Sequence, residues 1–225
     1  MAGRPDGDAL PLGLRNRLAE LILEAFDAPP ARRALEALAS FCRSEDGRVG
    51  VDAAERLAAF GCFAPAGSGR VQLLGTHRAH RDALCRRAAA AWAMLESHTV
   101  PTDGSTLLGL LTRAAWLADA GLYFEVHELL EPAWFRAEGA ERVALQGLIQ
   151  VAVAFHHLGN GNRDGAVSLL SEGLAKLETA GAALALDASE WIRSLGALLT
   201  AWRAGTPPPP IPGWPTPSEA ARRST

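Results

Sequence analysis

The chain has 225 residues, is 48% hydrophobic and carries a formal net charge of −3 at pH 7. This apolar content can build a substantial core, and the length fits one large helical domain or two small ones. The slightly acidic balance argues against nucleic acid as a partner. No apolar run approaches the roughly 20 residues that a membrane span requires. The first residues lack the apolar stretch of a signal peptide, so we expect a soluble cytoplasmic protein.

The three cysteines lie in the N-terminal half, at Cys42, Cys62 and Cys85. They form no Cys-x-x-Cys pair, and their number is odd. Both features argue against a disulfide framework.

The N-terminal half is predicted to be mainly helical over residues 12–98, after a disordered segment at residues 1–11. Helices are expected at residues 12–26, 31–43, 52–60 and 77–96. Asp52 is the predicted cap of the third helix. A Gly-tipped β-hairpin is expected near residues 62–74, and residues 99–104 are predicted to form a linker. Helices followed by such a hairpin suggest a winged helix, although no clear recognition helix precedes the hairpin.

The C-terminal half predicts a bundle of antiparallel helices over residues 105–204, so the predicted fold class is all-α with one short hairpin. Its five helices are expected at residues 105–120, 122–135, 141–158, 163–177 and 188–203. Gly121 ends the first of these helices, and Asp187 with Glu190 forms a capping box before the last. The Pro-rich tail, residues 205–225, is predicted to be disordered, with docking of Trp214 as the alternative.

Two neighbouring helices of this bundle carry polar residues within apolar faces. On a helical projection His127 and Glu131 fall inside the apolar arc of the first, Glu128 lies at its boundary and Glu125 points to solvent. The second helix places a stripe of three polar residues on one face: Gln146, Gln150 and His157. If the stripe faces His127 and Glu131, the helices enclose a buried polar network.

This network has two interpretations, and both stay open. In the first it is structural and fixes the register of two helices, because a buried polar group needs a partner. In the second, His127, Glu131 and His157 bind a divalent metal such as zinc, iron or manganese, with Glu128 nearby. The known spacings for zinc proteases and di-iron proteins are absent.

The segment from ADAGLYFEVHELLEPAW through LQGLIQVAVAFHHLGNGN closely resembles a small helical family, the domain of unknown function 309. The similarity covers about residues 117–177 and implies a compact bundle of antiparallel helices. The family brings no established activity. Its motif positions correspond to Tyr123, Phe124, Glu125, His127, Glu128, Glu131, Trp134, Gln146, Gly147, Gln150, His157, Gly159 and Asn160. Of the adjacent histidines 156 and 157, the second is aligned with the family position.

The main functional hypothesis is a non-enzymatic scaffold or partner-binding module, whose partner is another protein or a second copy of the chain. Helix pairs of this kind resemble the units of helical repeats, which bind peptides in grooves. In this interpretation Tyr123, Phe124, Trp134, Gly147 and Asn160 are structural support. The first alternative is a metal- or ligand-binding protein, with hydrolase activity as one form of it. The second is winged-helix-like DNA binding by the N-terminal half.

Overall fold

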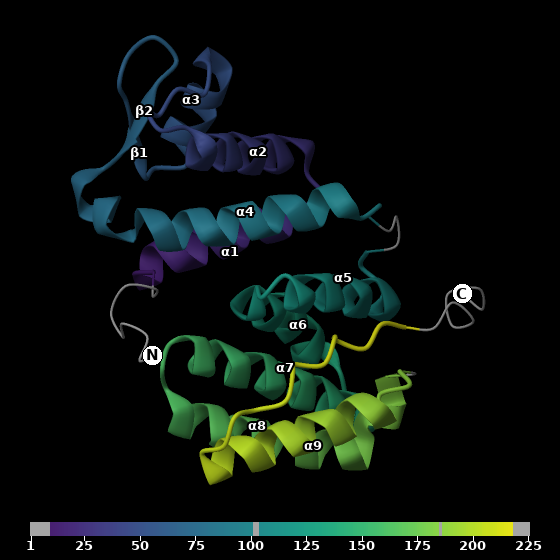
Figure 1. Cartoon of the computed structure of the whole chain (residues 1–225). Helices are drawn as coiled ribbons and strands as arrows, with labels where there is room; N and C mark the ends of the chain where they lie inside the picture. Colours follow the sequence, from purple (N-terminus) through teal and green to yellow (C-terminus); the bar gives the residue numbers. More distant parts are fainter. Residues whose placement is uncertain (1–9, 101–103, 185, 218–225) are drawn as a thin grey trace. The chain divides into compact units, whose positions relative to one another are not determined.

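Figure 1 shows the computed structural model of the chain, which describes residues 10–100, 104–184 and 186–217. Within these residues the chain is all-α apart from one short hairpin, which confirms the predicted fold class. It divides into an N-terminal unit, Met1–Val100, and a C-terminal unit, Pro101–Thr225. None of the described helices combines the length and apolarity needed to cross a membrane.

The N-terminal unit contains four α-helices, a short 3-10 helix and the hairpin within its described residues. In chain order these are α1 (Leu12–Glu24), α2 (Pro29–Arg43), α3 (Val51–Ala59), β1 (Phe63–Pro65), β2 (Val71–Leu73), η1 (Gly75–His80) and α4 (Arg81–Ser97). Pro29 and Pro30 begin α2, a position where the missing N–H costs no helical hydrogen bond. Residues 1–9 of the predicted disordered segment lie outside the described residues, while Leu10 is buried.

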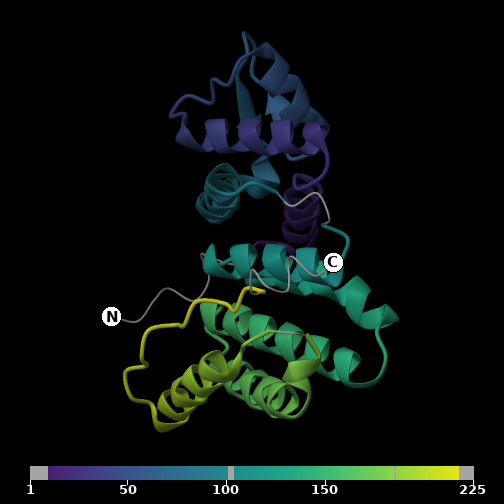
Figure 2. The same ribbon diagram turned by 90° about the vertical axis from the view of Figure 1, so that its right-hand side faces the viewer.

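The core of this unit lies where α1, α2 and α4 pack together (Figure 2). Fully buried leucines line α2 and α4, at Leu35, Leu38, Leu84 and Leu95. The hairpin pairs Phe63 with Leu73 in antiparallel register. The ring of Phe63 also meets Phe41 of α2 edge to face, at 4.9 Å between centroids. The hairpin is therefore attached to the end of α2 through an aromatic pair.

Two sequence predictions for this unit are wrong. Cys42 of α2 and Cys85 of α4 form a disulfide, and the odd count arises because Cys62 stays free and buried. Burial raises the pKa of the Cys62 thiol, and Arg17 partly opposes that rise. Asp52 does not cap α3, because Gly50 occupies the cap position and no side chain bonds there.

The C-terminal unit is a bundle in which short connections reverse the chain between consecutive helices (Figure 1). Its elements are α5 (Leu107–Asp119), α6 (Tyr123–Arg136), α7 (Gly139–Gly159), α8 (Arg163–Ala180), η2 (Gly181–Leu184) and α9 (Ser189–Ala204). Gly121 takes the predicted left-handed conformation, with φ of 73°. At the start of α8, Asn162 Oδ1 accepts a hydrogen bond from the Gly165 N–H at 3.0 Å. Residues 101–103 of the expected linker lie outside the described residues.

Helix α9 begins without the predicted capping box. Its cap position is Ala188, and no side chain makes a capping hydrogen bond there. The Asp187–Glu190 spacing fits the pattern, but the helix starts one residue later than the box requires.

The segment after α9, residues 206–217, is here called the C-terminal arm. It has no regular secondary structure and runs back over the bundle, in yellow in Figure 1. Trp214 is only 6% exposed, and its ring lies 4.9 Å from the ring of Trp191 of α9. Trp214 thus docks on the bundle, which was the alternative to a disordered tail, because burial of a large indole holds this part of the arm. Residues 218–225 lie outside the described part of the chain.

Candidate functional site

Three of the predicted site residues form a local group on α6. His127 Nδ1 lies 3.1 Å from Glu128 Oε1, and its Nε2 lies 3.7 Å from Glu131 Oε1. The side chains of His127 and Glu131 remain 25% and 40% exposed. The group is therefore half-exposed on the surface of one helix, whereas the sequence predicted a buried network. Water screens such pairs, so they contribute little to stability.

The polar stripe of α7 turns toward α8 and away from this group. Gln150 Nε2 donates to Glu172 Oε2 of α8 at 2.8 Å. His157 Nδ1 accepts a hydrogen bond from Asn162 Nδ2 at 2.6 Å, at the start of α8. Gln146 is half-buried one turn before Gln150 on the same helix. The predicted meeting of the stripe with His127 and Glu131 is therefore wrong for Gln150 and His157.

His156 faces α6, although its neighbour His157 was predicted to do so. The His156 ring lies 5.6 Å from the ring of Phe124, which also lies 6.0 Å from the ring of His127. His156 Nε2 is also 3.1 Å from Asn160 Nδ2. Adjacent side chains on a helix point about 100° apart, so His156 and His157 meet different helices although they are neighbours in sequence. Both the His127 and the His156 imidazoles therefore lie beside the Phe124 ring on this side of the bundle.

The predicted structural residues make packing contacts. Tyr123 stacks on Phe155 of α7 at 5.0 Å between ring centroids. The guanidinium of Arg142 lies 4.6 Å from the ring centroid of Trp134, and its Nη1 donates to the Trp134 carbonyl at 3.0 Å. These contacts tie the start of α6 to α7 and its end to the beginning of α7.

The most deeply buried charges of this unit were not predicted. Glu125 of α6 has no exposed surface and Arg113 of α5 is 4% exposed, while the projection had placed Glu125 in solvent. Each of them makes an interaction, and their helices are in contact. The projection failed because α6 packs against both α5 and α7, which cover more of its surface than one apolar arc. A signal existed in the sequence, since Glu125 lies between Phe124 and Val126 and matches a family motif position.

A separate cavity of about 170 Å³ lies between the C-terminal arm and the body of the bundle. Its lining comes from Ala118, Asp119, Tyr123, Phe155 and the arm residues 211–214. Asp119 Oδ1 accepts a hydrogen bond from the backbone N–H of Trp214 at 3.0 Å. Burial raises the pKa of the Tyr123 phenol, and the Asp119 carboxylate raises it further. Tyr123 was predicted to be a supporting residue, and its position beside the arm was not predicted.

The described residues offer no ready metal site. Among them, no three His, Cys, Asp or Glu side chains lie close enough to share a metal ion. His157 bonds to the start of α8 while His127 pairs with carboxylates of its own helix. The donor set predicted for zinc, iron or manganese is therefore divided between two places, which does not fit the convergent ligands such ions need.

The polar residues thus occur as separate local groups within an all-α bundle. Residues 111–169 match the model of the family described as a domain of unknown function, DUF309. This match confirms the resemblance noted in the sequence and spans α6, α7 and parts of α5 and α8. No curated protein and no solved structure matches the chain significantly.

Proposed function

We propose that the C-terminal unit is a non-enzymatic partner-binding module that holds extended, proline-rich peptide segments with a tryptophan anchor. One observation carries the proposal: the C-terminal arm lies on the bundle as an extended segment, and buries Trp214 against Trp191. A surface that accommodates one such segment has the shape and chemistry to accommodate another.

The contacts of the arm define the chemistry of such a partner. The carboxylate of Asp119 accepts from a backbone N–H, an interaction that any peptide can make and that the negative charge strengthens. The indole supplies a large apolar area and selects for tryptophan. The prolines before it restrict the free segment to extended conformations, which reduces the entropy lost on binding.

The distribution of the polar residues also favours binding over catalysis. A catalytic group needs a base, a reacting group and an orienting partner within hydrogen-bond reach of one point. His127, Gln150 and His157 instead bond to three different neighbours. In the N-terminal unit, α3 presents Asp52 and Glu55 beside Arg56, a mixture of charges that gives no support to the DNA-binding alternative.

The test uses the full-length chain with Trp214→Ala, which leaves its own arm unanchored. A fluorescent peptide of residues 206–217 is titrated against this variant and against the wild type, with anisotropy as the readout. We expect the variant to bind the peptide more tightly, because the anchored arm of the wild type competes at high local concentration. Size-exclusion chromatography then shows whether a second copy supplies the segment.

Two matched controls accompany this titration. A peptide with alanine in place of its tryptophan is expected to lose binding, and Asp119→Ala in the protein is expected to weaken it. Circular dichroism establishes that each variant keeps its helices. The proposal fails if a folded Trp214→Ala variant does not bind the peptide, or if the alanine peptide binds equally well.

A further inference from the structure

The disulfide of the N-terminal unit joins the end of one helix to the start of another. Cys42 is the last residue but one of α2, and Cys85 is the fifth residue of α4. Their Cα atoms are 5.3 Å apart, and both residues are partly exposed. A partly exposed disulfide can be attacked by a thiolate from solution, because exchange requires access to one sulfur.

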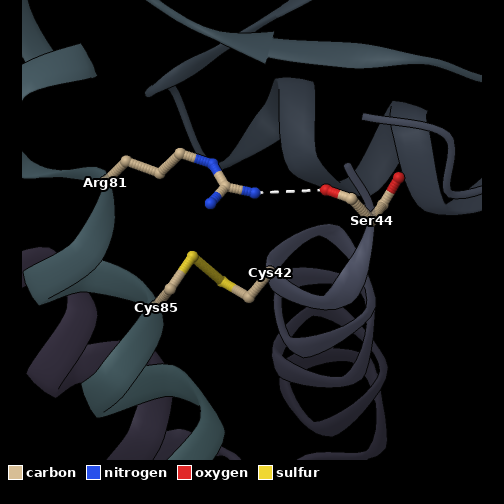
Figure 3. The surroundings of a disulfide bond; sticks show 4 residues. All are labelled: Cys42, Ser44, Arg81 and Cys85. Atoms are coloured by element: carbon tan, nitrogen blue, oxygen red, sulfur yellow. Dashed lines mark hydrogen bonds between the residues drawn. A yellow bond between two sulfur atoms is a disulfide. The ribbon is translucent and has the colours of Figure 1, made fainter. Parts of the chain in front are cut away.

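The contact between α2 and α4 does not depend on this bond. At the far end of the pair, Arg32 Nη2 of α2 donates to the Leu95 carbonyl of α4 at 2.8 Å. Near the disulfide, Arg81 Nη2 of α4 donates to the Ser44 carbonyl just after α2 at 3.1 Å (Figure 3). Buried leucines fill the space between these two ends. We therefore expect the helices to remain attached when the sulfurs are reduced, with the two thiols within reach of each other.

Arg81 also places a positive charge beside the cysteines. It lies four residues before Cys85, so the two side chains share one face of α4. Its guanidinium lies 5.2 Å from the ring centroid of Phe41, the residue before Cys42. Figure 3 shows that Arg81 and Cys85 both reach from α4 toward the end of α2. A fixed guanidinium favours the thiolate form of a nearby cysteine, which is the reactive form in exchange.

We propose that Cys42 and Cys85 form a reversible redox couple, exchanged with dithiol reductants, and that Arg81 is its positioning and activating residue. A dithiol attacks one sulfur as its thiolate, the Cys42–Cys85 bond breaks, and a mixed disulfide forms. The second thiol of the reductant then attacks the mixed disulfide and displaces the cysteine that was attacked first. The products are two protein thiols and an oxidised reductant, so two electrons and two protons pass to the protein.

The couple is independent of the peptide-binding proposal, because all its residues lie in the N-terminal unit.

The experiment uses the full-length wild-type chain. Free thiols are blocked without reductant, the protein is then treated with dithiothreitol without denaturant, and newly exposed thiols are alkylated with iodoacetamide at neutral pH. Peptide mass spectrometry follows Cys42 and Cys85 separately from each other and from Cys62, the free thiol that the first blocking step addresses. We expect full reduction with the helical circular dichroism retained, and re-formation of the bond with oxidised glutathione.

Variants of Arg81 test its assigned role. In Arg81→Met we expect alkylation of the reduced pair to slow by roughly three- to tenfold, because the thiolate loses its neighbouring charge. Arg81→Lys keeps the charge and should react nearly as fast as the wild type. Arg33→Met removes an exposed guanidinium elsewhere on α2 and should change nothing.

Two results overturn the proposal. One is a disulfide that dithiothreitol reduces only in denaturant, or a reduced protein that loses its helices; either marks the bond as a structural cross-link. The other is an alkylation rate in folded Arg81→Met equal to that of the wild type, which removes Arg81 from the couple. If Arg81→Met fails to fold, the reduction and re-oxidation of the wild-type chain still decide between these outcomes.

Discussion

Gly147 of α7 and Gly173 of α8 face each other where the two helices cross. A Cβ atom on Gly173 would lie 2.9 Å from the Gly147 carbonyl oxygen, and one on Gly147 would lie 3.1 Å from the Gly173 carbonyl oxygen. Both positions therefore need glycine for the close approach of two backbones. Gly147 was predicted to be a supporting residue, but its partner Gly173 was not predicted.

Alanine at either glycine is expected to destabilise the C-terminal unit. In Gly147→Ala the new methyl group would also lie 2.8 Å from Leu177 Cγ, so the helices must move apart or the leucine must shift. We expect a loss of about 1–3 kcal/mol, as for other overpacked cores. Thermal unfolding followed by circular dichroism measures it.

Gly196→Ala is the matched control. This glycine lies inside α9, and a Cβ atom added to it would meet no atom within 4 Å apart from the adjoining backbone of its own helix, so its replacement adds helix propensity without a clash. We expect a gain of roughly 0.5–1 kcal/mol. Equal melting temperatures for Gly147→Ala, Gly173→Ala and the wild type would show that the crossing tolerates a side chain.

The buried charges on α5 and α6 are expected to compensate each other. Arg113 and Glu125 have opposite signs, are almost fully buried, and lie on helices that contact each other. Glu125→Leu should cost about 3–5 kcal/mol, because it removes one partner and leaves a buried positive charge. Denaturant unfolding followed by tryptophan fluorescence gives the magnitude.

A double-mutant cycle separates pairing from simple packing. The pair Arg113→Met with Glu125→Leu removes both charges and keeps side chains of similar size. If the charges compensate each other, the double variant should be more stable than Glu125→Leu alone. Additive losses for the two substitutions would mean that each charge has a different partner.

Tyr123 offers a direct probe of the surface beneath the arm, because it is the only tyrosine in the chain. Burial, and then the charge of Asp119, raise its pKa above the usual value of 10.0. Ultraviolet titration of the phenolate should therefore give a pKa above that value. In Asp119→Asn, which keeps an acceptor for Trp214, the pKa should fall but stay elevated, since burial is the larger cause. An ordinary pKa in the wild type would contradict the burial of this phenol.

The same shift predicts a loss of stability in alkali. A pKa raised in the folded state means that folded protein retains a proton that unfolded protein releases. The stabilisation by neutral Tyr123 is complete below the ordinary pKa of tyrosine and disappears as pH rises through the folded pKa. Melting temperatures across this alkaline range, compared between the wild type and Tyr123→Phe, measure the effect. The phenylalanine variant should lose less stability, because it has no phenol to ionise.

Glu131→Gln tests the structural against the metal-binding interpretation of the α6 group. The half-exposed pair with His127 predicts a change in unfolding free energy of no more than about 0.5 kcal/mol. We also expect the metal content of tag-free protein, measured by mass spectrometry, to be the same in wild type and variant. Near-stoichiometric zinc, iron or manganese in the wild type, lost in the variant, would establish the metal-binding interpretation instead.

The sequence was sufficient for most of the helices and for the class of fold. Periodic apolar residues and the turn at Gly121 located α5, α6 and α7 to within a few residues, because these signals depend on local geometry. The disulfide was not predictable in this way. Its formation depends on α2 lying beside α4, and a count of cysteines carries no information about that contact.

The candidate site was harder to predict because it depends on which helices are neighbours. Gln150 and His157 do share one side of α7, as their spacing indicated, but that side meets α8. Glu125 was misplaced because a helix with neighbours on two sides has less free surface than a single apolar arc implies. The spacing of residues along one helix fixes the relative directions of their side chains. The packing of the whole bundle determines which helix each side chain meets.

The bond between Asp119 and Trp214 joins residues 95 positions apart, while neighbouring helices of the bundle meet across short connections. Contacts between distant residues form late in folding, because the chain must first lose the entropy of the intervening loop. Once the helices have packed, however, the two residues are already held near each other. We therefore expect the arm to close last over an assembled bundle, and to be the first part of this unit to open.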